Sequence, residues 1–481
     1  MPATETAQTT FRILAADKLA EEGLEYIRSQ PDAELINEPG LDDDRLKEMI
    51  GEHDGMIVRS GVTVTAETLS QPGRLKAIAR AGVGVDNIDL AAATARGILV
   101  MNTAAASTIS TAEHAFALMM ALSRNIGPAC RKMHEGGWDR SQYVGHQLSG
   151  HTLGVVGFGR IGQTVAERAL AFGMKVVGYD PLYAESTALD GKVVMFREFE
   201  KMLPEADYLT FHVPLNNDTR GMLNDQTFDL CRPGVKVINA SRGGVVDEDA
   251  LLKAVDDGRC GGAALDVYSH EPPPADSPLR RHDKILTTPH LGASTHEAQQ
   301  AVSVDAARSL LDYLRGKGIA GAVNVRGLQV DLDPLQTAFV DLADRMARLI
   351  SPMITGPVDS VTIELSGDRL SRAAGTLERH VLIGLLQSHL DLPLNVINVR
   401  HVAEERGITL RTVTVDDEKA GGNRLTIEVG GSDEVRRAVG RVYDDYRPRV
   451  IEINGYHMDM VPAGPVILLQ NEDRPGMVGL V

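Results

Sequence analysis

Cysteine is scarce in this chain: 481 residues include only three, Cys130, Cys231 and Cys260, at no paired spacing. That usage argues against a disulfide framework or a zinc site and favours a reducing compartment. No apolar run reaches membrane-spanning length. The first ten residues carry Glu5 but no Lys or Arg, which is typical of neither a secretory signal nor a transit peptide. We therefore expect a soluble, cytoplasmic protein.

Positive charge is also in short supply. Asp and Glu number 66 against 49 for Lys and Arg, and the formal net charge is -17. Such a chain repels polyanions, so we expect neither nucleic acid nor an anionic membrane as a partner. An anionic substrate would need a local cluster of Arg or Lys.

The length suggests roughly three domains at about 150 residues each. From residue 11 onward, apolar runs alternate with helical patterns. Strands are expected at 11–16, 33–37, 55–59 and 98–103, with a charged helix at 42–50. This alternation is typical of a parallel α/β sheet. The segment 107–125 is apolar nearly all round and predicts a buried helix that connects two domains or packs at a subunit interface.

The region from 151 to 290 has the clearest pattern. Six strands are expected there, at 152–158, 175–180, 207–213, 235–240, 262–268 and 284–288. Six strands with short helical crossovers predict a doubly wound sheet. After residue 326, strands at 359–365, 410–415 and 425–429, with a Gly421-Gly422 turn between the last two, predict a separate, smaller α+β domain.

A glycine loop follows the first of those six strands. Gly157, Gly159 and Gly162 form a G-x-G-x-x-G between a strand and an amphipathic helix. Gly157 permits the tight turn, Gly159 lets a pyrophosphate approach the backbone, and Gly162 lets the helix pack closely on the strand. The free N–H groups at the start of the helix favour phosphate. The context predicts a dinucleotide site.

Asp180 ends the next strand, 18 residues after Gly162. A carboxylate there accepts hydrogen bonds from a ribose 2′-OH and repels a 2′-phosphate, which favours NAD over NADP. The alternative is that Asp180 merely caps the turn at Pro181.

Three ionisable residues follow strand ends, where open parallel sheets bind ligands. His290 can act as the base that takes a hydroxyl proton near neutral pH, and Glu271 would orient the imidazole of His290. Arg242 suits a bidentate grip on a substrate carboxylate. The residues alone leave other interpretations open: His212 also ends a strand, Arg242 could be a phosphate clamp or a surface charge, and Glu271 could simply begin a Pro-rich loop.

Six stretches together carry a family resemblance: RAGVGVDNIDLAAATARGILVMNT, TLGVVGFGRIG, VVGYDP, NASRGGVVDEDALLKAV, GAALDVYSHEPP and TPHLGAST. They lie between residues 80 and 295, and their order resembles that of the D-isomer-specific 2-hydroxyacid dehydrogenase family. The resemblance implies hydride transfer between NAD and a small D-2-hydroxy acid. It implies a homodimer or homotetramer, which suits the helix expected at 107–125.

The resemblance also assigns roles. Arg242 would hold the substrate carboxylate, Glu271 and His290 would form the acid–base pair, and Asp266 would help hold the nicotinamide. His212 would lie by the adenosine, which removes it as a catalytic rival. Further cofactor contacts would come from Arg160, Ile161, Pro214, Ala240, Ser241, Gly292 and Ala293. The substrate side would be lined by Arg59, Ser60, Gly84 and Asn102, with Arg140 reaching a phosphate from a neighbouring subunit.

One stretch departs from the family. After Asn102-Thr103 the family often has Pro and Asn, whereas this chain has Ala104, Ala105 and Ala106. We expect the loop that joins the domains, and with it domain closure or substrate preference, to be altered.

The C-terminal part resembles the long members of the family, which act on 3-phosphoglycerate. LNVINVRHVAEERGI and VIEINGYHMDMVPAGP resemble their intervening domain, and GPVILLQNEDRPGMVGLV resembles the start of an ACT domain, a βαββαβ regulatory module. Asn471, Asp473 and Gly476 would lie in its ligand-binding turn. The module would be incomplete, as in a truncated fragment or a variant that lacks it, and we expect no normal inhibition by serine.

We therefore expect an α/β protein with two Rossmann-like doubly wound parallel-sheet domains, an α+β intervening domain and the start of an ACT module. The expected bounds are 1–103 plus 292–325 for substrate binding, 104–291 for NAD, 326–462 for the intervening domain and 463–481 for the ACT segment. The expected reaction is NAD-dependent oxidation of 3-phospho-D-glycerate to 3-phosphohydroxypyruvate. The alternatives are a hydroxypyruvate or glyoxylate reductase, a non-catalytic NAD-sensing corepressor-like binding protein, and a catalytically weak scaffold.

Overall fold

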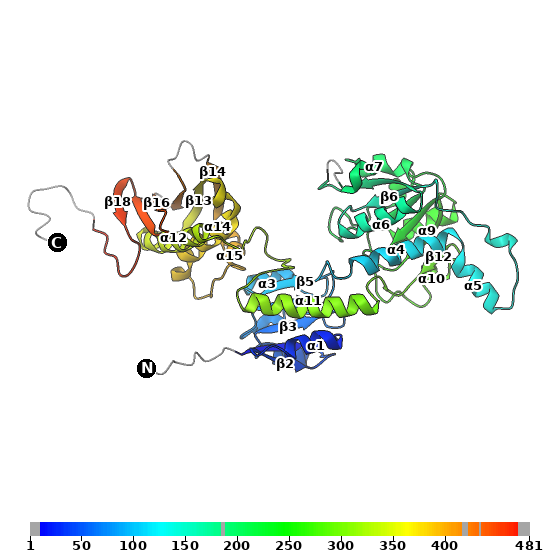
Figure 1. Ribbon diagram of the computed structural model, residues 1–481, viewed down its shortest axis with the longest axis horizontal. Helices are drawn as coiled ribbons and strands as arrows, with labels where there is room; N and C mark the ends of the chain where they lie inside the picture. The colour runs from blue at the N-terminus through cyan, green and yellow to red at the C-terminus, as the bar shows by residue number, and fades with distance from the viewer. Residues whose placement is uncertain (1–9, 184–187, 416–421, 432–433, 470–481) are drawn as a thin grey trace, which may run out of the picture.

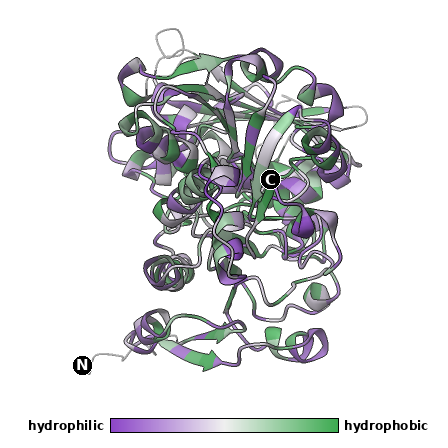
Figure 2. Cartoon of the chain, turned by 90° about the vertical axis from the view of Figure 1, so that its right-hand side faces the viewer, coloured by the Kyte–Doolittle hydropathy of each residue, from purple (hydrophilic) through white to green (hydrophobic). Residues whose placement is uncertain are grey.

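A computed structural model describes residues 10–183, 188–415, 422–431 and 434–469 (Figure 1). Three sheets lie in separate parts of the molecule, and each has its own apolar core. Figure 2 shows apolar residues concentrated along the strands, with hydrophilic residues mostly on the surrounding helices and loops. None of the helices in the described ranges has the length and apolar content needed to span a bilayer.

The first sheet is parallel and has the order β2-β1-β3-β4-β5. Its strands are β1 (Phe11–Ala15), β2 (Ala33–Asn37), β3 (Gly55–Val58), β4 (Ala77–Arg80) and β5 (Leu99–Asn102). Its helices are α1 (Glu21–Arg28), α2 (Asp43–Ile50), η1 (Thr68–Ser70), α3 (Leu90–Ala95) and, from much later in the chain, α11 (His296–Leu314). The strand order reverses direction at β1, with β2 on one side of it and β3 to β5 on the other, so the expected doubly wound topology is confirmed.

The long helix α11 returns the chain to this first sheet. Val302 and Leu310 are buried in the same core as Ile13, and α11 packs against α1 and β4. At Gly55 in β3, a Cβ atom would stand 2.9 Å from Leu310 Cδ1, so a small residue is required where strand and helix meet. The N-terminal strands and the segment after residue 292 therefore share one core.

The second sheet has seven parallel strands in the order β12-β11-β10-β9-β6-β7-β8. They are β6 (Thr152–Val156), β7 (Lys175–Tyr179), β8 (Val194–Phe196), β9 (Tyr208–Phe211), β10 (Val235–Asn239), β11 (Cys260–Leu265) and β12 (Ile285–Thr287). All six strands expected in this region are present. The seventh, β8, was not expected.

Helices cover the second sheet. They are α4 (Thr108–Ser123), α5 (Ile126–His134), η2 (Ser141–Tyr143), α6 (Arg160–Ala171), η3 (Ala188–Gly191), α7 (Phe199–Met202), η4 (Leu203–Glu205), α8 (Asp225–Phe228), α9 (Glu248–Asp256) and α10 (Pro278–Arg281). The apolar helix expected at 107–125 is α4, and its buried residues include Ala115 and Met119. One edge of α4 is exposed, with 54% of Ile109 accessible.

The third sheet is mixed and has the order β14-β13-β15-β16-β17-β18, with only β13 and β14 parallel. Its strands are β13 (Val358–Ser366), β14 (Thr409–Val415), β15 (Arg424–Gly431), β16 (Val435–Val442), β17 (Pro448–Ile453) and β18 (Tyr456–Met460). Its helices are α12 (Pro334–Ile350), η5 (Ser351–Met353), α13 (Asp368–Arg372), α14 (Ala374–Leu386), η6 (Gln387–His389) and α15 (Val399–Glu405).

The third domain is α+β, as expected, and its core lies between the sheet and the α12–α14 pair. Gly421 of the expected turn, and Asn471, Asp473 and Gly476 of the ACT-like segment, lie outside the described residues.

This third domain docks on the first through the loop before α15. Asn395 Nδ2 donates to the carbonyl of Gly97 at 2.9 Å, and a Cβ at residue 97 would stand 2.3 Å from that nitrogen. Ile397 is buried in the core of the first sheet. The segment resembling the intervening domain thus contacts the first domain directly.

Candidate active site

The second sheet reverses its order between β6 and β9, and ligands bind at such switch points. The glycine loop lies there. Gly157 has a φ of +88°, in the left-handed region that favours glycine. A Cβ at Gly162 would stand 2.0 Å from the Gly157 carbonyl oxygen, whereas Gly159 has open space where its Cβ would be. The loop therefore has the shape of a phosphate cradle at the start of α6.

Asp180 follows β7 and turns its carboxylate to this loop. Oδ2 accepts from the backbone N–H of Phe158 at 2.8 Å, and Oδ1 accepts from that of Leu182 at 2.9 Å. These bonds fix the carboxylate beside the glycines, and its remaining lone pairs can accept from ribose hydroxyls. Asp180 thus caps the turn at Pro181 and lies beside the glycine loop.

His212 lies at the end of β9, against the same loop. Its Nε2 is 2.9 Å from Thr210 Oγ1, and burial lowers its pKa to about 4. The imidazole is therefore neutral at neutral pH, which suits a neighbour of the cofactor better than a proton-transfer group. The other residues expected at the cofactor lie on the loops and first helix turns of this region: Arg160, Ile161, Pro214, Ala240, Ser241, Gly292 and Ala293. The cradle and the acid together fit a dinucleotide without a 2′-phosphate.

Glu271 and His290 meet beyond the ends of β11 and β12. Glu271 Oε2 lies 2.6 Å from His290 Nδ1, and Oε1 accepts from the backbone N–H of Tyr268 at 3.0 Å. The carboxylate is thus anchored at one oxygen and orients the imidazole with the other. About half of the His290 side chain is exposed, so its Nε2 side is open to a ligand.

Asp266 anchors the loop that carries His290. Its side chain is fully buried, and its carboxylate accepts from Thr288 Oγ1 at 2.6 Å and lies 3.1 Å from His114 Nε2. It also accepts from the backbone N–H groups of Leu291 and Gly292, at 2.7 and 2.9 Å. Burial raises the pKa of this carboxyl, but the donors outweigh burial and lower it overall. Asp266 is therefore a buried anion that fixes the loop.

Arg242 lies on the loop after β10, next to the Glu271 loop. A Cβ at Gly243 would stand 1.8 Å from the Tyr268 carbonyl oxygen, so the two loops touch. The Nε of Arg242 donates to Asp86 Oδ2 of the first domain at 3.0 Å. The structure thus brings Arg242, Glu271 and His290 to the same edge of the second sheet.

The substrate-side candidates lie at the carboxyl ends of the first sheet. Arg59 and Ser60 follow β3, Gly84 follows β4, and Asn102 ends β5, where its Nδ2 donates to the Val83 carbonyl at 2.6 Å. Asp17 shapes the loop after β3: its Oδ2 accepts from the N–H groups of Arg59, Gly61 and Val62 at 3.0, 2.8 and 3.2 Å.

Arg80 is a candidate that the sequence reasoning missed. It ends β4, and burial, together with Arg242 and Arg59, lowers its pKa to about 10. Its Nε has no hydrogen-bond partner among the described residues. Three arginines therefore gather here, the local positive cluster that an anionic substrate requires in a chain of net negative charge. The signal was present in the sequence, since Arg80 begins the RAGVGVDN stretch.

Arg140 lies apart from this cluster within one chain. It is exposed and immediately precedes η2. Figure 1 shows α5, the helix before it in the chain, at the end of the second domain away from the first sheet. Ile126, Met133, Trp138 and Val144 in the same segment are more than half exposed.

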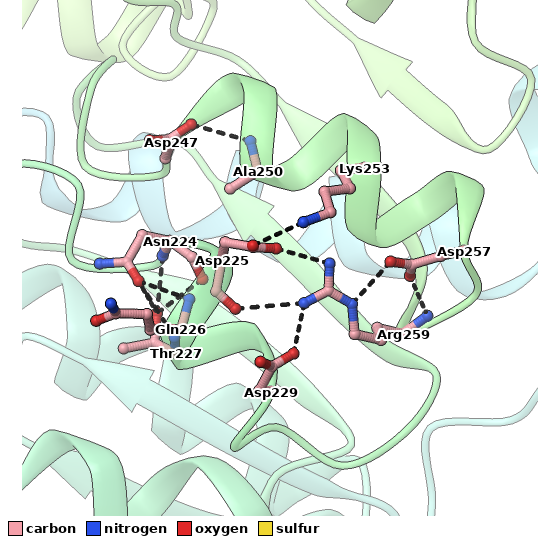
Figure 3. A network of polar contacts seen from close by, with 10 residues as sticks. All are labelled: Asn224, Asp225, Gln226, Thr227, Asp229, Asp247, Ala250, Lys253, Asp257 and Arg259. Atoms are coloured by element: carbon pink, nitrogen blue, oxygen red, sulfur yellow. Dashed lines mark hydrogen bonds and ion pairs between the residues drawn. The ribbon is translucent and has the colours of Figure 1, made fainter.

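A wide surface hollow between α8 and α9 plays no part in this site. Asp225, Asp247 and Lys253 are among its lining residues (Figure 3). Asp225 lies 2.7 Å from Lys253 Nζ and 2.8 Å from Arg259 Nη2, and Arg259 also pairs with Asp229 and Asp257. Asp247 caps α9 by accepting from the backbone N–H of Ala250. This network joins α8, α9 and the start of β11 and is structural.

Comparison with known proteins matches two parts of the chain to family models. Residues 116–292 match the NAD-binding domain of D-isomer specific 2-hydroxyacid dehydrogenases, and residues 336–454 match the D-3-phosphoglycerate dehydrogenase intervening domain.

Individual relatives agree. The D-3-phosphoglycerate dehydrogenases of Bacillus subtilis and Archaeoglobus fulgidus are each 36% identical to this chain over 98% of its length and 89% of theirs. Among solved structures, a D-lactate dehydrogenase from Aquifex aeolicus, complexed with NAD and lactic acid, is 29% identical with a TM-score of 0.56, covering 64% of this chain and 96% of that one.

Proposed function

The chain belongs to the D-3-phosphoglycerate dehydrogenases, a family of NAD-dependent D-2-hydroxyacid dehydrogenases, and we propose that Arg242, Glu271 and His290 carry out its reaction. That reaction oxidises 3-phospho-D-glycerate to 3-phosphohydroxypyruvate, the first step of L-serine biosynthesis. The observation that supports these roles most directly is the 2.6 Å contact between Glu271 and His290 beside the Arg242 loop.

The proposed roles follow from the geometry. NAD, when bound, supplies the acceptor for the hydride that leaves C2. His290 takes the C2 hydroxyl proton at Nε2, while Glu271 at Nδ1 orients the ring and stabilises the imidazolium that forms. Arg242 grips the substrate carboxylate and so fixes C2 in place. In the reverse direction His290 returns the proton.

The cofactor site is proposed to follow the cradle already described. Gly157, Gly159 and Gly162 would hold the pyrophosphate at the start of α6, and Asp180 the adenosine ribose. Asp266 would contact the nicotinamide through the loop it anchors, because its own carboxylate is fully buried. The remaining contacts would come from Arg160, Ile161, His212, Pro214, Ala240, Ser241, Gly292 and Ala293.

Phosphate recognition is proposed to rest on arginines. Arg59 and Arg80 would meet the phosphate within one chain, beside Ser60, Gly84 and Asn102. Arg140 would reach it from a neighbouring subunit, because α5 and the segment after it expose Ile126, Met133 and Trp138 for a partner to cover. This supports a homodimer or homotetramer.

The domain division is proposed as 1–103 plus 292–325, 104–291, 326–462 and 463–481. The shared core of the N-terminal strands and α11 supports the discontinuous first domain. The last segment is proposed to begin an ACT-like regulatory module. A reducing, cytoplasmic setting is supported by three free thiols, of which Cys231 and Cys260 are buried.

The test is NADH absorbance with purified protein and equal concentrations of phosphohydroxypyruvate, hydroxypyruvate and glyoxylate. We expect a strong preference for phosphohydroxypyruvate. Equal or greater rates with the unphosphorylated acids would indicate a general 2-hydroxyacid reductase. No turnover with any of them would favour a binding protein that keeps the dehydrogenase fold.

A further inference from the structure

Arg242 and Asp86 come from different sheets, 156 residues apart in the chain. Asp86 lies on the loop after β4 in the first domain, and Arg242 lies on the loop after β10 in the second. The Nε of Arg242 donates to Asp86 Oδ2 at 3.0 Å. The bond therefore joins the two domains at the carboxyl ends of their sheets, where the substrate would lie.

The contact uses one particular part of the guanidinium. A guanidinium can grip a carboxylate at its side edge, Nε with one terminal nitrogen, or at its end edge, through both terminal nitrogens. Asp86 takes Nε, and Nη1 donates to the Ser241 carbonyl at 2.7 Å. Within the described ranges these are the only partners of the Arg242 side chain, so Nη2 and the second hydrogen of Nη1 remain for a ligand.

Gly84 makes room for this arrangement. A Cβ at residue 84 would stand 2.0 Å from Arg242 Nη2 and 2.8 Å from Asp86 Oδ2. The loop between β4 and α3 thus approaches the guanidinium from the side that carries Nη2. A side chain at residue 84 would therefore collide with both partners of this hydrogen bond.

Stability does not explain the contact. About two thirds of the Asp86 side chain is exposed, and ion pairs at that exposure contribute little to folding. Local charge gives a better reason, since Arg59, Arg80 and Arg242 repel one another here. A carboxylate on Nε offsets part of that repulsion and holds one of the three in a single orientation.

We propose that Asp86 is a positioning residue: it takes the Nε of Arg242 and turns the terminal nitrogens toward the substrate carboxylate. The inference rests on the role proposed for Arg242 above. The opposing interpretation is that Asp86 competes with the substrate carboxylate for Arg242. The two predict opposite effects of removing the carboxylate, because a positioning residue lowers KM and a competitor raises it.

Full-length Asp86→Ala and Asp86→Asn variants test this with phosphohydroxypyruvate and NADH. We expect Asp86→Ala to raise KM for phosphohydroxypyruvate about ten- to a hundredfold, with a smaller change in kcat, because a charge-assisted bond is lost. Asp86→Asn should restore most of the loss, since its amide oxygen still accepts from Nε. NADH affinity, measured by fluorescence, should not change. Asp43→Ala, an exposed carboxylate on α2, is the matched control for lost surface charge.

A double-mutant cycle tests whether Asp86 acts through Arg242. If Asp86 acts through Arg242, Asp86→Ala should have no further effect in an Arg242→Gln background. An unchanged or lower KM in Asp86→Ala, or an equal effect in both backgrounds, would overturn the proposal. A wild-type protein without phosphohydroxypyruvate turnover would instead overturn the proposed function, so the two failures can be told apart.

Discussion

The backbone N–H of His290 donates to the carbonyl of Asp266 at 3.0 Å, and this bond holds His290 at a φ of +54°. Few residues other than glycine adopt that conformation, and when they do, neighbouring structure has to enforce it. The Asp266 carboxylate does so from the other side, by accepting from the N–H groups of Leu291 and Gly292. The orientation of the proposed base is thus set by a buried anion.

His114 on α4 should matter to turnover because it supplies a donor to that anion. We expect His114→Leu to lower kcat about tenfold or more, since a small displacement of the His290 loop misplaces the base. His114→Gln, which keeps a donor, should retain most of the activity. The measurement is kcat at saturating phosphohydroxypyruvate, with thermal midpoints as a check on folding. If the two variants lose activity equally, the donor is not what matters.

Removing the proposed base should separate chemistry from binding. His290→Ala should lower kcat about 100- to 10,000-fold, the usual contribution of a general acid–base group. NADH binding should persist, because the glycine loop and Asp180 lie on other strands. Single-turnover rates and fluorescence titration measure the two effects. Near-normal turnover in His290→Ala would mean that another residue is the base.

The Glu271–His290 pair could be anticipated because parallel topology brings neighbouring strand ends together. The apolar runs that become β6, β7 and β9 to β12 were clear for the same reason: buried parallel strands are continuously hydrophobic. By contrast, β8 has only three residues, and β16 carries Arg436, Arg437 and Arg441 among its eight. Strands so short or so charged have no visible pattern.

Contacts between domains were beyond sequence reasoning. The bond from Arg242 to Asp86 depends on how two sheets face each other. The hydrophobic periodicity of the sequence predicts single strands and helices, and it does not predict that arrangement. The same holds for Asn395, whose bond to Gly97 docks the third domain on the first. Arg80 begins a stretch that carries the family resemblance, but β4, the strand that it ends, was not expected, and its place beside two other arginines comes from the structure.

Arg80 should help the protein to prefer a phosphorylated substrate over an unphosphorylated one. Arg80→Met preserves much of the volume but removes the charge, so KM for phosphohydroxypyruvate should rise about tenfold or more. KM for hydroxypyruvate should change much less. The thermal midpoint should hold or rise, because the variant no longer buries a cation that Arg59 and Arg242 repel. Equal effects on both substrates would place Arg80 away from the phosphate.

The stability of the folded protein at acidic pH should depend on the protonation of His212. Burial lowers its pKa from 6.5 to about 4 in the folded protein, so between these values the unfolded chain binds a proton that the folded chain does not. Stability therefore falls as pH drops through this window, by about 3 kcal/mol between pH 6.5 and 4 for this group alone.

His212→Asn removes the group that titrates, so its stability should lose about that much less than the wild type over the same pH range. Urea unfolding of the protein without cofactor, at intervals of pH, measures the difference between the two curves. His457→Asn, at an exposed position on β18, is the matched control and should follow the wild type. Parallel curves for His212→Asn and the wild type would mean that His212 can be protonated in the folded protein. Its exclusion as a proton-transfer group would then fail as well.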